Sequence, residues 1–122
     1  MQYAVLIYET PGMLDGFDES QRQAITAEYL ALRQDPACLD GASLAGVEAT
    51  TTMRVADGEA LVTDGPFANT KEIFAGYYVI EADDLDDALQ YAARIPAARL
   101  GGSVEIRPVA FRLPTAPVGA SS

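Results

Sequence analysis

The chain has 122 residues, of which 49% are hydrophobic and 21% charged, a composition typical of one globular domain. Eighteen Asp and Glu against eight Lys and Arg give a net charge of −10, which repels nucleic acids and anionic membranes, so we predict neither as a partner. Cys38 is the only cysteine and histidine is absent, which excludes an intramolecular disulfide, a thiolate metal cluster and a histidine-activated nucleophile.

Signals for membrane insertion, export and common cofactors are also missing from the sequence. No stretch approaches the ~20 apolar residues of a membrane helix. The first residues, MQYAVLIYE, lack a basic region and include the carboxylate of Glu9, unlike a signal peptide. We therefore expect a cytoplasmic protein. Without a glycine-rich phosphate loop, zinc-ligand spacing or a metalloprotease motif, we predict no cofactor and no metal.

The first predicted elements are a strand and a helix. Residues 3–8 (YAVLIY) are short, apolar on both alternating faces and followed by turn residues, which indicates a strand buried on both sides. Residues 19–33 show helical periodicity, with Asp18 or Ser20 as the cap and Pro36 beyond the end. The apolar residues expected to face the core from this helix are Ile25, Ala27, Tyr29, Leu30, Ala31 and Leu32.

The middle of the chain predicts a loop, a hairpin and a strand. Asp40-Gly41 indicates a turn, and residues 43–48 carry little pattern. Residues 50–55 and 60–63 are rich in apolar and β-branched side chains and flank an Asp-Gly turn, which is a strong hairpin signal. Residues 76–81 (GYYVIE) predict a further strand.

The last third predicts a second helix, a final strand and a tail. The acidic run at residues 83–87 is expected to cap a helix that ends near Pro96. Residues 103–111 alternate as a strand, in which Pro108 should lie at an edge or at the end of a ladder. We expect residues 113–122 to form a flexible tail after a single α+β domain spanning 1–112. The expected buried stripe of the second helix is Leu85, Ala88, Leu89, Ala92 and Ile95.

The predicted order is β-α-β-β-β-α-β, with the hairpin inserted into the split β-α-β arrangement of a ferredoxin-like α+β fold. Two amphipathic helices can cover only one face of such a sheet. Strand 3–8 is apolar on both faces and strand 76–81 nearly so, so the second face needs a cover that the chain does not supply. We expect a homodimer packed sheet to sheet.

The main candidate for function is VTDGPFANTKE, residues 62–72. One interpretation is architectural: Pro66 fixes φ, Asp64 hydrogen-bonds its own downstream amides, and Phe67 plugs the core. The other is that Asp64, Lys71 and Glu72 converge on a cleft beside the sheet, where a carboxylate near an ammonium acts as a general base or binds a polar ligand. Both interpretations remain open at this point.

Three further features have competing interpretations. Tyr77 and Tyr78 lie on opposite faces of strand 76–81, so one belongs to the core or a dimer interface while the other can line a cavity. The acidic run 83–87 is interpreted as helix capping and a solvated face rather than as a metal site. Cys38 is interpreted as a small apolar filler rather than as a nucleophile.

Residues 61–96 read LVTDGPFANTKEIFAGYYVIEADDLDDALQYAARIP. An Asp-Gly-Pro-Phe box is followed by Thr-Lys-Glu, a Gly-Tyr-Tyr strand and an acidic-capped helix ending at Ile-Pro. Together with MQYAVLIYE, ATTTMRVADGEALV and GGSVEIRPV, this resembles the YCII-related family, and within it the DGPF-domain branch. The resemblance covers residues 1–111 and implies a ferredoxin-like chain that dimerises into an α/β barrel.

The resemblance implies little about activity, because members of this family are mostly uncharacterised. It points to a small-molecule enzyme in the dimer cleft, or to a role linked to extracytoplasmic-function sigma factors. Related YCII proteins carry a His-Asp pair suspected of catalysis, which this histidine-free chain cannot form.

We therefore predict that the protein binds a small polar or cationic metabolite where the DGPF loop meets the sheet, with acid–base chemistry. The alternative is a non-enzymatic interaction or regulatory module. The expected catalytic residues are Asp64, Lys71 and Glu72, and the expected ligand-binding residues are Gly65, Pro66, Phe67, Thr70 and Tyr78.

Overall fold

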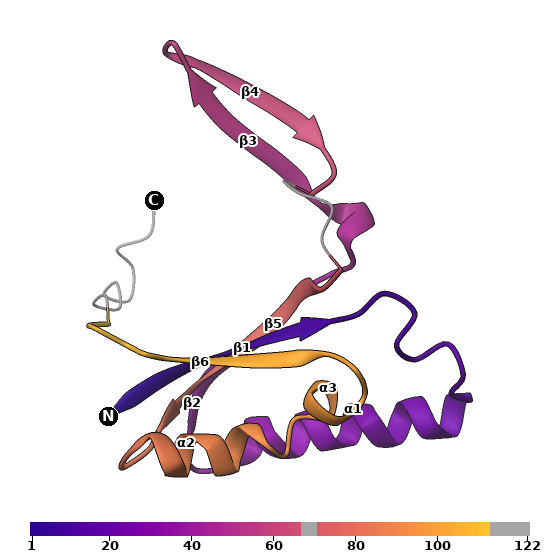
Figure 1. Ribbon diagram of the computed structural model, residues 1–122, viewed down its shortest axis with the longest axis vertical. Helices are drawn as coiled ribbons and strands as arrows, with labels where there is room; N and C mark the ends of the chain where they lie inside the picture. The colour runs from indigo at the N-terminus through magenta and orange to yellow at the C-terminus, as the bar shows by residue number, and fades with distance from the viewer. Residues whose placement is uncertain (67–70, 113–122) are drawn as a thin grey trace, which may run out of the picture.

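The computed structural model describes residues 1–66 and 71–112. It contains a four-stranded sheet with helices on one face, and a two-stranded arm that stands apart from the sheet (Figure 1). In chain order the elements are β1 (Gln2–Glu9), α1 (Glu19–Gln34), β2 (Cys38–Ser43), the 3-10 turn η1 (Val47–Ala49), β3 (Thr51–Ala56), β4 (Glu59–Asp64), β5 (Ile73–Glu81), α2 (Leu85–Ala92), α3 (Pro96–Arg99) and β6 (Ser103–Pro108).

The main sheet has the strand order β2-β5-β1-β6, with every pairing antiparallel. β1 lies in the centre and pairs with β5 on one side and β6 on the other. With the β3–β4 arm set aside, the chain follows the β-α-β-β-α-β order of ferredoxin-like folds. The predicted α+β fold class is confirmed, and β6 is an edge strand that ends at Pro108, as expected for a residue without an N–H.

The strand β2 corrects the sequence prediction, which had no strand over residues 38–43 and placed a turn at Asp40-Gly41. The segment CLDGAS contains no β-branched or aromatic residue, so its own propensity for a strand is low. Pairing with β5, from Cys38 opposite Ile80 to Ser43 opposite Gly76, forms the strand instead. Cys38 itself is buried, which fits its interpretation as an apolar filler.

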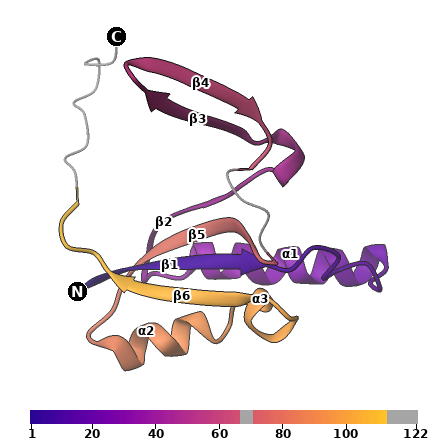
Figure 2. The ribbon, with the colours of Figure 1, turned by 45° about the horizontal axis from the view of Figure 1, so that its top comes forward.

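The two faces of the sheet have different environments. Tyr3, Val5 and Ile7 of β1 are buried on the face that the three helices cover, which we call the helix-side face. Leu6 and Tyr8 alternate with them and are half-buried on the opposite face. Among the described residues, no helix lies over this second face, and we call it the uncovered face (Figure 2).

α1 begins and ends close to its predicted bounds. Its N-cap is Asp18, whose carboxylate accepts a hydrogen bond from the Gln21 N–H while the Gln21 side chain accepts one from the Asp18 N–H, forming a reciprocal capping box. Ile25 and Leu32 are buried and Tyr29 is half-buried, as predicted. The predicted widening of the stripe is wrong, because the helix contacts the sheet along a narrow line. The exposed members are Ala27, Leu30 and Ala31.

The second predicted helix is two shorter helices. Asp84 caps α2 by accepting a hydrogen bond from the Asp87 N–H, and Pro96 begins α3 at a position where its missing N–H costs nothing. Ala88, Ala92 and Ile95 are buried as predicted. Leu85 and Leu89, which were predicted to be buried, are exposed. Tyr91, which the prediction left out of the core, is buried.

The predicted hairpin is confirmed as the β3–β4 arm. Asp57 and Gly58 both have positive φ, 51° and 77°, as a two-residue hairpin turn requires. In both ribbon views the arm projects away from the sheet on its uncovered side (Figures 1 and 2).

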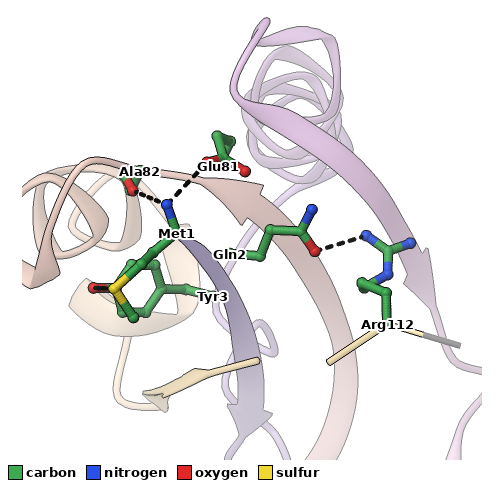
Figure 3. Close-up of polar contacts among 6 residues, drawn as sticks. All are labelled: Met1, Gln2, Tyr3, Glu81, Ala82 and Arg112. Carbon is green, nitrogen blue, oxygen red and sulfur yellow. Dashed lines mark hydrogen bonds and ion pairs between the residues drawn. The ribbon is translucent and has the colours of Figure 1, made fainter. Parts of the chain in front are cut away.

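Polar contacts join the two chain ends of the described region to the sheet. The Met1 amino group donates hydrogen bonds to the Glu81 carboxylate at 2.9 Å and the Ala82 carbonyl at 3.0 Å (Figure 3). Arg112 donates one to the Gln2 side chain at 3.4 Å. The predicted tail, residues 113–122, lies outside the described residues. No helix within the described ranges is long and apolar enough to cross a membrane.

Candidate functional site

The structure distributes the predicted site residues over three places. Asp64 is exposed as the last residue of β4. Lys71 and Glu72 lie immediately before β5, at the other end of the segment that follows the arm. Tyr78 is buried on the helix-side face of β5. Two further predicted ligand-binding residues, Phe67 and Thr70, lie outside the described residues.

The beginning of the DGPF motif closes the root of the arm. The Gly65 N–H donates a hydrogen bond to the Thr50 carbonyl at 2.8 Å, and its carbonyl accepts one from the Thr52 hydroxyl at 2.7 Å. Gly65 has φ +101°, a conformation in which a side chain would be strained. Gly65 therefore has a structural role, while Pro66 beside it is exposed.

Lys71 and Glu72 line a hollow of about 550 Å³ with Tyr8 and Thr10. We call it the sheet-end hollow. The Ser103 hydroxyl donates a 2.8 Å hydrogen bond to Glu72, which fixes the orientation of that carboxylate. A hydrogen bond to the Glu105 carboxylate, together with burial, raises the pKa of Tyr8. Because Tyr8 points to the uncovered face, this hollow opens on that face.

A second hollow, of about 320 Å³, lies between α1 and the helix-side face of the strands β2 and β5. We call it the helix–sheet hollow. Its walls are mainly apolar and aromatic, and Thr26, Glu9 and Arg33 supply polar groups. Arg33 is exposed and Glu9 is half-buried, so both charges remain accessible from solvent. An apolar hollow with a few polar groups is the usual form of a small-molecule site.

Two glycines line this hollow where neighbouring groups approach the backbone closely. Gly41 and Gly76 both line it from neighbouring strands. A Cβ on Gly41 would lie 2.8 Å from the Tyr78 ring, and one on Gly76 would lie 2.5 Å from the Ala42 carbonyl oxygen. The sequence prediction missed this site, although a glycine inside a strand is a known signal of close backbone approach.

Tyrosines form the inner wall of the helix–sheet hollow. The Tyr78 hydroxyl donates a 2.7 Å hydrogen bond to the Tyr29 carbonyl, and the Tyr29 hydroxyl accepts one from the Ala97 N–H at 3.2 Å. Burial raises the pKa of Tyr78 to about 12 and also raises that of Tyr29. Tyr78, a predicted ligand-binding residue, thus lines a hollow in its neutral form. Because its hydroxyl proton is already donated to Tyr29, the part of Tyr78 available to contact a ligand is its ring.

Comparison with known proteins places the chain in a family. The sequence profile of the YCII-related domain matches residues 1–111. The chain belongs to the YCII-related family. This YCII-related chain is 34% identical over 119 residues to the uncharacterised protein R00369 of Rhizobium meliloti (strain 1021), covering 93% of the present chain and 96% of that relative.

A solved structure shows the same fold. It is 5-chloro-2-hydroxyhydroquinone dehydrochlorinase (TftG) from Burkholderia phenoliruptrix AC1100, in complex with 2,5-dihydroxybenzoquinone. The two structures superpose with a TM-score of 0.54 over 89% of this YCII-related chain and 93% of TftG, at 15% sequence identity. At this identity the likeness supports the fold and carries no residue roles.

Proposed function

We propose that the protein binds a small molecule in the helix–sheet hollow, with the ligand's apolar body against the tyrosine wall and a polar or anionic group near Arg33. The observation that carries the proposal is a space of about 320 Å³ that is lined by Gly41, Gly76 and tyrosine side chains and flanked by an accessible cation, Arg33. The binding energy would come from apolar burial, and the charge would orient the ligand.

The structural neighbour supports the size class of the ligand. The molecule in the TftG complex, 2,5-dihydroxybenzoquinone, is a single six-membered ring with hydroxyl and keto groups. The smallest ligand pockets of proteins, roughly 300 Å³, suit molecules of about this size. Hydroxylated single-ring compounds are therefore the first compounds to test on this chain.

The test is a panel of hydroxylated benzoquinones, phenols and benzoates, including 2,5-dihydroxybenzoquinone, screened by thermal shift and then by calorimetry. We expect at least one compound to raise the melting temperature in a concentration-dependent way. Leu30→Trp, which fills the hollow from α1, should abolish this binding, and Arg33→Gln should weaken binding of the anionic members by about tenfold.

Ala31→Trp is the matched control, because Ala31 is exposed on the same helix, one residue beyond Leu30. It should bind like the parent. If no panel member binds, or if a compound binds Leu30→Trp as tightly as the control, the helix–sheet hollow is not the site.

A second candidate, acid–base chemistry in the sheet-end hollow, rests on the hydrogen bond from Ser103 to Glu72. We propose that Glu72 acts there as a general base, with Lys71 holding the substrate. Asp64, at the end of β4, does not line this hollow. In a homodimer packed sheet to sheet, which we also propose, the uncovered face would close over this hollow. Glu72→Gln and Lys71→Met should stop any turnover of the panel compounds, and the second site fails if both variants keep the parent rate.

A further inference from the structure

The β3–β4 arm has one face that is apolar and exposed. Met53 pairs with Val62 and Val55 pairs with Ala60, so these four side chains lie on the same face of the arm. Met53, Val55 and Val62 are 61%, 66% and 62% exposed. The opposite face carries more polar side chains, with Thr52 directly across from Thr63.

An arm of this kind needs a cover. A two-stranded hairpin alone in water is at best marginally stable, and a contiguous exposed apolar surface marks an interaction site. The arm leaves the body on the same side as the uncovered face of the sheet (Figure 1). The arm and the uncovered face of the sheet therefore lie on the same side of the body.

The areas of these surfaces indicate what they can bind. Four strands about 4.8 Å apart and roughly 24 Å long give the uncovered face an area of about 450 Å². Two such faces bury roughly 900 Å², less than the ~1,200 Å² at the lower limit of specific stable interfaces. Each arm face adds about 200 Å² and covers as much of its partner. With both arms the buried area reaches about 1,700 Å², close to the ~1,600 Å² of a standard interface.

Charge indicates which partner fits. The chain has a net charge of −10, yet the four apolar side chains of the arm carry no charge, and the centre of the uncovered face holds Leu6, Tyr77 and Val79. Like-charged copies repel each other elsewhere, so these surfaces are where two copies can approach. A two-fold axis would cover both faces and both arms at once, which a single different partner would not achieve.

We infer that the arm is a clasp: in the homodimer, the face formed by Met53, Val55, Ala60 and Val62 packs on the second copy while the uncovered faces pack together. Asp64 lies at the root of this same arm face, opposite Thr51. The clasp therefore brings that carboxylate to the dimer interface, on the side where the sheet-end hollow of each copy opens.

The test compares Val62→Glu with Thr63→Glu. These neighbouring residues are both exposed, and the substitutions add the same charge, but only Val62 lies on the apolar face. Sedimentation over a concentration series should show the parent at twice the chain mass. Val62→Glu should raise the dimer dissociation constant about tenfold or more, and Thr63→Glu should change it by no more than about twofold.

Hydrogen exchange of the parent at low and high protein concentration keeps the test informative if Val62→Glu fails to fold. Amides of residues 51–64 should become protected together with those of β1 and β6 as dimer forms. A parent that stays monomeric, a dimer that Val62→Glu weakens no more than Thr63→Glu, or exchange in the arm that is independent of concentration would each overturn the clasp. Binding of ring compounds in the helix–sheet hollow does not depend on any of these outcomes.

Discussion

Tyr78 connects the sheet, α1 and α2 through one side chain. Its hydroxyl donates to the Tyr29 carbonyl of α1, and its ring meets the Tyr91 ring edge to face, with centroids 5.8 Å apart. Tyr91 in turn donates a 2.6 Å hydrogen bond to the Leu32 carbonyl. Two phenol hydroxyls thus bind helix carbonyls from inside the core, where each is sheltered from competition by water.

The pH dependence of stability should report on Tyr78. Burial raises its pKa from 10.0 to about 12 in the folded state, so the neutral phenol stabilises the fold fully below pH 10 and loses that contribution as the pH rises toward 12. Urea unfolding at pH 8, 10 and 11 should show a steeper loss of stability for the parent than for Tyr78→Phe. At pH 8 the lost hydrogen bond should cost about 1 kcal/mol.

Tyr77→Phe is the control for that experiment, because it removes a phenol hydroxyl from the neighbouring residue on the uncovered face. If Tyr78→Phe follows the parent profile above pH 10, then burial of Tyr78 is not what limits stability in alkali.

At the scale of single elements, the helix caps offer a sharp comparison. Asp84 accepts the hydrogen bond from the Asp87 N–H, whereas Asp83 is exposed one residue before the cap. Asp84→Ala should lower the free energy of unfolding by about 1 kcal/mol. Asp83→Ala should stay within about 0.5 kcal/mol of the parent. Equal losses in urea unfolding would mean that the charge of the first turn, and not the cap bond, stabilises α2.

The elements that could be predicted from sequence are those that depend on local chemistry. The hairpin turn at Asp57-Gly58 and the cap at Asp18 follow from residues a few positions apart, and both were found. β2 forms only because β5 pairs with it, so its weak local pattern concealed it. The exposure of Leu85 also depends on tertiary contacts. Residue spacing predicts which side chains share one face of a helix, but it does not predict how much of that face contacts the sheet.

The candidate site could be predicted only in part for a related reason. The sequence alone shows that Lys71 and Glu72 are neighbours, because they are consecutive. Only the structure shows the hydrogen bond that Glu72 accepts from Ser103, 31 residues away. The helix–sheet hollow is lined by residues such as Gly41 and Gly76, which lie in strands that pair only in the folded chain. A cavity of this kind is visible in sequence only after the register is known.

At the scale of the whole molecule, the ferredoxin-like chain presents two different surfaces to its surroundings. The helix-side face encloses a hollow suited to a small molecule, and the uncovered side presents an apolar sheet and an apolar arm. The hollow supports the small-molecule interpretation, and the arm is the exposed apolar surface that an interaction module would need. A clasped homodimer reconciles the two, because it uses the arm for assembly and leaves the helix–sheet hollow open.

The proposed dimer should respond to salt in a direction set by its net charge. Two chains of −10 each repel one another, and salt screens this repulsion over a Debye length of about 10 Å at 0.1 M. Between about 20 mM and 500 mM NaCl, the dimer dissociation constant measured by sedimentation should therefore fall several-fold. The uncovered face also carries Glu105 and Arg107 in β6, at positions paired with Leu6 and Ala4. If ion pairs between Glu105 of one copy and Arg107 of the other dominated association, the dissociation constant would rise with salt, and the interface would be electrostatic rather than apolar.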